Sequence, residues 1–158
     1  MTLEYRSSRR SRRHMKHNDN KWFCVIIGIL ILGGIIWWVT YSIKERYLQD
    51  DPMLRKLKQT MTPLHPDIKN IELYKGKKSY TINKEKIYLC LKDENDDYYP
   101  TNHLIYVYLH EVAHVLNKDD IGHTEKFHKI FQELVEQAHN MGIYNASIPP
   151  IDNYCMHT

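Results

Sequence analysis

A run of 18 residues without a charged side chain, Trp22 to Val39, sets the first limit on how this 158-residue chain can fold. With Thr40 and Tyr41 it reaches the roughly 20 residues that an α-helix needs to cross about 30 Å of hydrocarbon. Aromatic residues stand near both ends, as at membrane interfaces: Trp22, Phe23, Trp37, Trp38 and Tyr41. A soluble domain of this size seldom buries a helix that is apolar on all sides. The sequence therefore predicts a transmembrane helix at residues 22–41, with the lipid bilayer as its partner.

A cleaved signal peptide is the alternative interpretation of this run. Signal peptides have an apolar region of about 7–15 residues followed by a cleavage site of small residues. The run here is longer, and the alanines of the chain lie far downstream, at Ala113, Ala138 and Ala146. We therefore expect the segment to remain as a membrane anchor.

Charge is divided unevenly between the two sides of the anchor. Residues 1–21 carry seven Lys/Arg against Glu4 and Asp19, a net charge of +5. Residues 42–158 carry 15 Lys/Arg and 17 Asp/Glu, a net charge of −2. The folded part is therefore mildly acidic, and we expect no nucleic-acid partner for it, because binding to phosphates relies on basic surfaces.

The first 21 residues form a basic tail without apolar periodicity, which predicts disorder. Within 15 residues of the span, residues 7–21 hold six Lys/Arg and residues 42–56 hold four. This excess predicts a single-pass membrane protein with a cytoplasmic N-terminus and with the main domain on the far side. Nuclear targeting or nucleic-acid contact by the tail is a less favoured interpretation.

The rest of the chain predicts a small domain of the α+β class. A helical stalk at residues 42–51 is expected to lead into a domain at residues 52–145, and residues 146–158 form a C-terminal tail. The domain should begin with a helix at Pro52, because Asp51 can cap it and proline suits the first helical turn.

Three strands and two helices are expected to follow. The strand-like runs are residues 71–74, 79–82 and 86–91, and the last two flank a turn at 83–85 as a hairpin would. The first helix is expected to be capped by Asn102 and to reach about Asn117. The second should begin near Thr124 and end at Gly142, which suits the position just after a helix.

The chemistry of the chain is carried by the motif His110-Glu111-Val112-Ala113-His114. Residues four apart project from one face of a helix, so both imidazoles can bind one Zn²⁺ at about 2.0–2.1 Å. Glu111 adjoins the first ligand, where it can serve as general base for a zinc-activated water that attacks a carbonyl. The residues around the motif are uncharged, which favours a half-buried helix over two solvated surface histidines: Val107, Tyr108, Leu109, Val112, Ala113, Val115 and Leu116.

A catalytic zinc usually has three protein ligands and one open position. The third candidate is His123, nine residues after His114 and directly after Gly122, which allows a tight approach of the chain. Glu125 and His128 are alternatives for this ligand, and an uninvolved loop histidine is the other interpretation of His123.

The stretch HEVAHVLNKDDIGHTEKFHKIF resembles the small WLM/SprT-like zinc metallopeptidases. In that family the two helix histidines are followed by a Gly-His-x-x-x-Phe element that supplies the third ligand. The resemblance covers about residues 52–145 and implies a zincin-like fold with His110, His114 and His123 as zinc ligands and Glu111 as catalytic base. It also implies that Phe127 packs to seat the closing helix. The gap between His114 and His123 leaves the branch of the family open.

Three functions are compatible with these residues. The first is a membrane-tethered zinc metallopeptidase that acts on a protein or peptide substrate. The second is a non-catalytic module that keeps the zinc fold for interaction or scaffolding at a membrane, and the third is hydrolysis of a non-peptide bond. Glu111 favours an enzyme, because a purely structural zinc site needs no base and normally has four protein ligands.

The remaining features leave alternatives open. Three cysteines do not make a disulfide framework, although Cys90 and Cys155 are free to pair in an oxidising compartment. Asn145 begins a glycosylation sequon that matters only if the domain is lumenal. An oxyanion-stabilising residue cannot be chosen among Tyr144, Tyr154 and His157, which follow the last helix.

Overall fold

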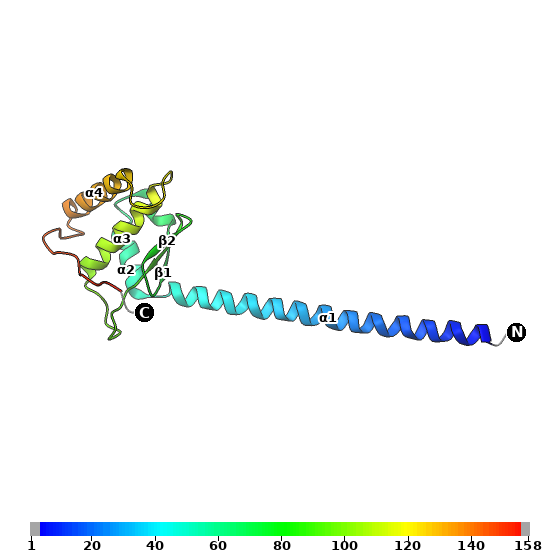
Figure 1. Cartoon of the computed structure of the whole chain (residues 1–158). Coiled ribbons are helices and arrows are strands. Elements are labelled where there is room, and N and C mark those ends of the chain that lie inside the picture. The colour runs from blue at the N-terminus through cyan, green and yellow to red at the C-terminus, as the bar shows by residue number, and fades with distance from the viewer. Residues whose placement is uncertain (1–3, 156–158) are drawn as a thin grey trace. The chain divides into compact units, whose positions relative to one another are not determined.

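The computed structural model describes the backbone of residues 4–155 and side chains from Lys21 onward. The chain divides into two compact units, and the boundary lies between Lys44 and Glu45. The fold is of the α+β class, with four α-helices and one three-stranded sheet in the described part of the chain (Figure 1).

The first unit consists of most of one long helix, α1 (Glu4–Gln49). Its stretch Lys21–Gln49 is long and apolar enough to cross a membrane, with a mean hydropathy of 2.5 over 18 residues that are not buried within the protein. The helix predicted at residues 22–41 is thus present, and the stalk continues it. The backbone before the span is helical from Glu4, and the disorder expected for the basic tail stays a prediction.

The second unit opens with the short helix α2 (Pro52–Met61), followed by the 3₁₀ turn η1 (Pro66–Asn70). Asp51 caps α2 as expected, since its carboxylate accepts a hydrogen bond from the backbone N–H of Met53 at 2.8 Å. The buried face of α2 consists of Leu54, Leu57 and Met61.

The sheet contains β1 (Glu72–Lys75), β2 (Tyr80–Ile82) and β3 (Lys86–Leu89) in the order β1-β3-β2. The predicted hairpin is present, with β2 antiparallel to β3. Its turn has positive φ at Asn83 (51°) and Lys84 (57°), as a type I′ turn requires. β1 lies on the other side of β3 and runs parallel to it. This leaves β2 as an edge strand among the described residues.

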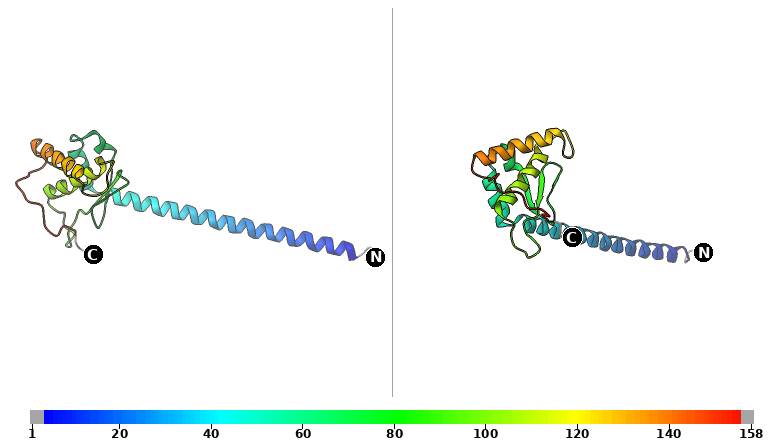
Figure 2. Two further views of the ribbon diagram at one scale, coloured as in Figure 1. Left: turned by 45° about the horizontal axis from the view of Figure 1, so that its top comes forward. Right: turned by 60° about the vertical axis from the view of Figure 1, so that its left-hand side comes forward.

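The helix α3 (Thr101–Leu116) lies between the sheet and α4 (Glu125–Asn140), as Figures 1 and 2 show. The expected cap of α3 at Asn102 is corrected by the structure, because the helix already begins at Thr101 and Pro100 occupies the cap position. The Asn102 side chain instead holds the backbone of Asn145, accepting from its N–H at 2.8 Å and donating to its carbonyl at 3.2 Å. The end of α4 agrees with the sequence, since Gly142 follows it with φ of +69°.

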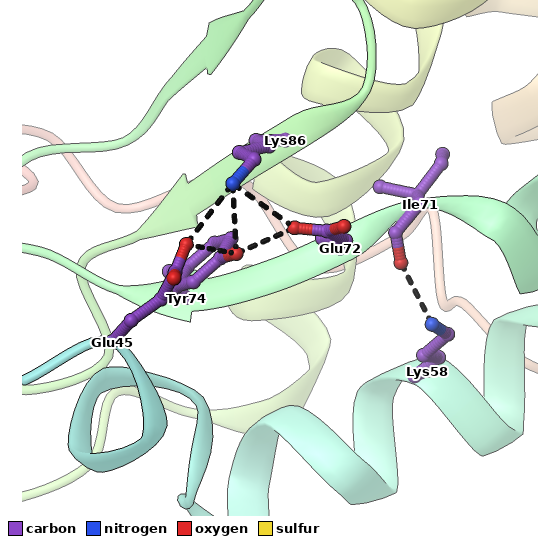
Figure 3. A network of polar contacts seen from close by, with 6 residues as sticks. All are labelled: Glu45, Lys58, Ile71, Glu72, Tyr74 and Lys86. Atoms are coloured by element: carbon purple, nitrogen blue, oxygen red, sulfur yellow. Dashed lines mark hydrogen bonds and ion pairs between the residues drawn. The ribbon is translucent and has the colours of Figure 1, made fainter. Parts of the chain in front are cut away.

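A polar network ties the start of the second unit to the sheet (Figure 3). Lys86 Nζ lies 3.0 Å from a carboxylate oxygen of Glu45 and 3.2 Å from one of Glu72. The Tyr74 hydroxyl donates to Glu45 at 3.0 Å and lies within hydrogen-bond distance of Glu72 and Lys86. Lys58 of α2 donates to the carbonyl of Ile71, directly before β1, at 2.7 Å. Within the second unit, these contacts tie the sheet to Glu45 and to α2.

The C-terminal residues 146–155 return across the domain without regular structure. Cys90, directly after β3, forms a disulfide with Cys155. Ile151 N–H donates to His103 Nδ1 at 3.1 Å, and the Tyr154 hydroxyl bonds to Ser79 and to the carbonyl of Cys90. We call residues 146–155 the C-terminal strap, because they are tied to both α3 and the sheet.

Candidate metal centre

The three histidines selected from the sequence meet at one place. His110 and His114 project from α3, and His123 comes from the loop between α3 and α4. Their ligand nitrogens all lie within 4.8 Å of one another. Nε2 of His110 and Nε2 of His123 are 3.0 Å apart.

This spacing suits a tetrahedral metal ion. Zinc–nitrogen bonds of about 2.0–2.1 Å at tetrahedral angles place two ligand nitrogens about 3.3 Å apart. The 3.0 Å between His110 and His123 is close to that value, and the other pairs of ligand nitrogens lie within 4.8 Å. Three imidazoles are a donor set typical of Zn²⁺, and they leave one coordination position open. The three residues therefore fit zinc.

The electrostatic surroundings keep two of these rings neutral. Burial, with the neighbouring His114 and His123 as a smaller cause, lowers the pKa of His110 to about 4. Burial and the proximity of His123 also lower the pKa of His114. Only the neutral imidazole has a lone pair for a metal, so these rings are in the ligating form at neutral pH.

The ring of Phe127 packs against the rings of all three histidines. Its centroid lies 5.0 Å from that of His110, 4.4 Å from that of His114 and 4.8 Å from that of His123. Phe127 is 1% exposed and begins the buried face of α4. A single apolar side chain thus seats α4 and limits the rotation of all three imidazoles.

Glu111 is a buried carboxylate beside the histidines. Its residue is 6% exposed, and its Oε2 accepts a hydrogen bond of 2.7 Å from the hydroxyl of Thr81 on β2. Burial raises the pKa of Glu111, and the Thr81 hydrogen bond opposes that rise. Glu111 and the three histidines line the same hollow of about 580 Å³. Sequence reasoning did not identify Thr81, because the contact joins residues 30 positions apart in the chain.

The loop at residues 117–124 that carries His123 is fixed by polar contacts. Lys84, in the β2–β3 turn, donates to the carbonyl oxygen of Asp120 at 3.0 Å and also to that of Asn117. The buried Asn117 donates to the Thr124 hydroxyl at 3.4 Å, and that hydroxyl donates to Asp120 at 3.3 Å. The same Thr124 oxygen accepts from the N–H of Phe127 and so caps α4.

Gly122 has a role other than the close approach expected from the sequence. A side chain at this position would meet no atom within 4 Å. Its φ of +86°, however, is strained for any residue with a Cβ. Glycine is therefore needed here for the backbone conformation that turns the chain toward His123.

The other candidate residues stand outside this cluster. His128 and Glu125 are exposed on α4, and neither belongs to the group of close ligand atoms found among the described residues. Tyr144 packs in the core with its ring 6.0 Å from that of Tyr106. Tyr154 lines a second hollow next to Glu111, and His157 lies outside the described residues.

No model of a known protein family matches the chain, and no solved structure matches it significantly. Three viral proteins are similar to it. "Uncharacterized protein 136R" of Invertebrate iridescent virus 6 is 50% identical over 88 residues, which are 54% of this chain and 49% of that protein. "Uncharacterized protein 042R" of Invertebrate iridescent virus 3 is 44% identical over 87 residues, 54% of each chain.

"Uncharacterized protein R325" of Acanthamoeba polyphaga mimivirus is 34% identical over 111 residues, 65% of this chain and 56% of that protein. The chain thus spans about half the length of the curated relatives that it matches. These similarities carry no activity to the chain, so the function is argued from the site.

The Lys84 contacts generate a first prediction. Replacing Lys84 with Met removes the donor that holds two carbonyls of the His123 loop, so the third ligand should be less well placed. We expect zinc affinity to fall about tenfold, at the lower end of the effect of second-shell changes. Chelator competition with the full chain in detergent measures this, independently of any activity. Lys118→Met, an exposed lysine in the same loop, is the matched control, and equal affinities of the two variants would contradict the assigned role.

Proposed function

We propose that this chain is a membrane-tethered zinc metallopeptidase that hydrolyses peptide bonds and is related to the WLM/SprT-like group. One observation carries the proposal: three histidine nitrogens converge in a hollow that also contains a buried carboxylate, Glu111. A zinc site with three protein ligands and an adjacent base is the arrangement expected for hydrolysis.

The roles of the residues follow from this geometry. His110, His114 and His123 would hold a zinc ion, which would supply Lewis-acid chemistry by lowering the pKa of a bound water to about 7. Glu111 accepts the proton of the attacking water and later passes it to the leaving amine. Thr81 orients the Glu111 carboxylate, and burial makes that carboxylate a better proton acceptor than one in water.

The edge strand supports a peptide as the substrate. β2 pairs with β3 on one side only within the described sheet, and Thr81 at its centre contacts Glu111. A free strand edge presents N–H and C=O groups with which an extended peptide can pair. Such a peptide would pass beside the general base, whereas a compact non-peptide substrate would not use this edge.

A non-catalytic zinc module is the second candidate that the residues permit. The buried carboxylate argues against it, because a buried charge destabilises the fold and a purely structural zinc site does not use one. The three ligands found among the described residues also differ from the usual four of structural zinc sites. Zinc content and substrate cleavage, measured on the same protein, distinguish the two candidates.

Glu111→Gln should separate metal binding from catalysis. Removing the general base is expected to lower the rate of cleavage of an unfolded protein such as casein by about 100-fold or more. Bound zinc, measured on the same full-length preparation, should stay near one ion per chain. Glu133→Gln, an exposed glutamate on α4, is the control and should retain activity. Folded wild-type protein without zinc would exclude the proposal, and zinc-loaded wild type that cuts no substrate would favour the non-catalytic module.

Thr81→Val should leave the base in place but loosen the position of its carboxylate. The valine keeps the shape of the side chain but leaves the buried carboxylate without its hydrogen bond, which is worth about 1–3 kcal/mol. We expect kcat to fall about tenfold while zinc content and KM stay unchanged. Thr81→Ser retains the hydroxyl and should restore most of the rate. Equal rates for the Val and Ser variants would show that the hydroxyl does not position Glu111.

The anchor determines where this activity would act. We propose a single-pass protein with its N-terminus in the cytoplasm and the second unit on the opposite side of the membrane. The excess of Lys/Arg before the span supports this orientation, as does the Cys90–Cys155 disulfide, since such bonds persist in oxidising compartments.

Protease protection tests the orientation. In sealed microsomal vesicles that contain the full chain, protease added outside should leave the second unit intact until detergent opens the membrane. A glycan at the exposed Asn145 should appear in the same vesicles and be absent from the Asn145→Gln variant. Digestion of the second unit without detergent would place it in the cytoplasm and overturn the orientation.

A further inference from the structure

We propose that the hollow between α3 and the C-terminal strap is a side-chain pocket that selects a large apolar or aromatic residue next to the scissile bond. This inference rests on the proposed peptidase function and names the substrate class that the enzyme would prefer.

The position of the hollow links it to the metal centre. It measures about 530 Å³, within the range of ligand-binding pockets, and lies next to the hollow that contains the three histidines. Ser79, His110 and Glu111 line both. A peptide whose carbonyl is placed between the metal and Glu111 therefore has one neighbouring side chain at the mouth of this second hollow.

The walls of the hollow are mostly apolar. α3 contributes Tyr106 and the half-exposed Val107, and the strap contributes Pro150, Ile151 and Tyr154. Apart from the catalytic groups, the lining is completed by Lys78, Ser79, His103 and Cys155. A surface of aromatic rings and aliphatic side chains recognises a partner of the same kind by excluding water.

Two titratable residues in these walls are uncharged at neutral pH. Burial lowers the pKa of His103, whose residue is 5% exposed. Burial also raises the pKa of Tyr154 to about 12, although its hydrogen bond with Ser79 opposes the rise. Apart from Glu111 at the end next to the metal centre, Lys78 therefore supplies the one charge in the described lining.

The strap holds this pocket in shape before any substrate binds. The Cys90–Cys155 disulfide fixes its end, and the hydrogen bond from Ile151 to His103 fixes its middle. The Tyr154 ring packs at 4.7 Å from that of His103, edge to face. A preformed pocket loses little free energy to ordering when it is filled, so that more of the gain from burial contributes to selectivity.

The expected preference can be measured with peptides cleaved by the zinc-loaded full chain in detergent micelles. Peptides that differ at one position beside the scissile bond, with Phe, Leu, Ala or Asp there, should show one position at which Phe or Leu is preferred. The preference over Ala should be about 10- to 100-fold in kcat/KM, as for filling a hydrophobic pocket. A flat profile at every position would overturn the pocket while leaving the peptidase function standing.

Val107→Trp places the variant side chain in the pocket. It should lower the ratio of kcat/KM for Phe over Ala at that position to about one, with zinc content unchanged. Ile151→Trp changes the opposite wall and should lower the same ratio. It tests the pocket independently if Val107→Trp fails to fold. Ile148→Trp lies on the exposed part of the strap outside the pocket lining and should keep the wild-type ratio. Unchanged ratios in both pocket variants would refute the proposal.

A binding measurement keeps the inference separate from the catalytic proposal. Two dipeptide hydroxamates that differ only in a benzyl or methyl side chain should bind the zinc-loaded chain with affinities at least tenfold apart. Val107→Trp should remove this difference. Equal affinities in the wild type would overturn the pocket even if no peptide is cleaved. A benzyl preference without any cleavage would support the pocket and count against the peptidase function alone.

Discussion

The site depends on the packing of α3 on two sides at once. One side of this helix lies against the sheet and the other against α4. Residues on both sides are completely buried, among them Leu104, Tyr108, Leu109 and Val112. Each such side chain contributes about 1.5–3 kcal/mol on burial, so turning the helix about its axis would expose several of them at once. The rotation of α3 is therefore fixed, and with it the directions in which the motif residues point.

Because the rotation of α3 about its axis is fixed, the five residues of the motif His110–His114 contact two different parts of the domain. Glu111 faces β2, where Thr81 donates to its carboxylate. His110 and His114, displaced around the helix, instead meet Phe127 and the loop that carries His123. The sheet thus supplies the partner of the proposed base, and α4 supplies the seat of the metal ligands. A separate element controls each half of the proposed chemistry.

Local patterns in the sequence predicted most of the elements and the central residues. The cap at Asp51, the hairpin around residues 83–85 and the helix end at Gly142 depend on neighbours within a few positions, and all are present. The histidine cluster was also predictable, because a helix fixes the spacing of His110 and His114 and a short loop limits where His123 can go. Asn102 is the exception among the caps, since its side chain bonds to the backbone of the distant Asn145.

The residues that the sequence did not reveal act over long separations. Lys84 and the carbonyl of Asp120 are 36 positions apart, and Tyr154 and Ser79 are 75 apart. No periodicity or motif marks a threonine, a lysine or a tyrosine for such contacts. The parallel pairing of β1 with β3 is hidden for the same reason, because it joins strands that are separated in the chain by β2.

Two segments that follow α3 in the chain line the two neighbouring hollows. The His123 loop closes the metal end, and the C-terminal strap closes the end proposed to take a substrate side chain. Lys84 holds the His123 loop by donating to two of its carbonyl oxygens. The strap is held by the Cys90–Cys155 disulfide and by the hydrogen bond from the Ile151 N–H to His103. The strap contributes none of the three histidines, and the His123 loop contributes no residue to the hollow beside the strap. The proposed metal centre and the proposed side-chain pocket are thus built by different segments of the chain, so a substitution in one can be tested without changing the residues of the other.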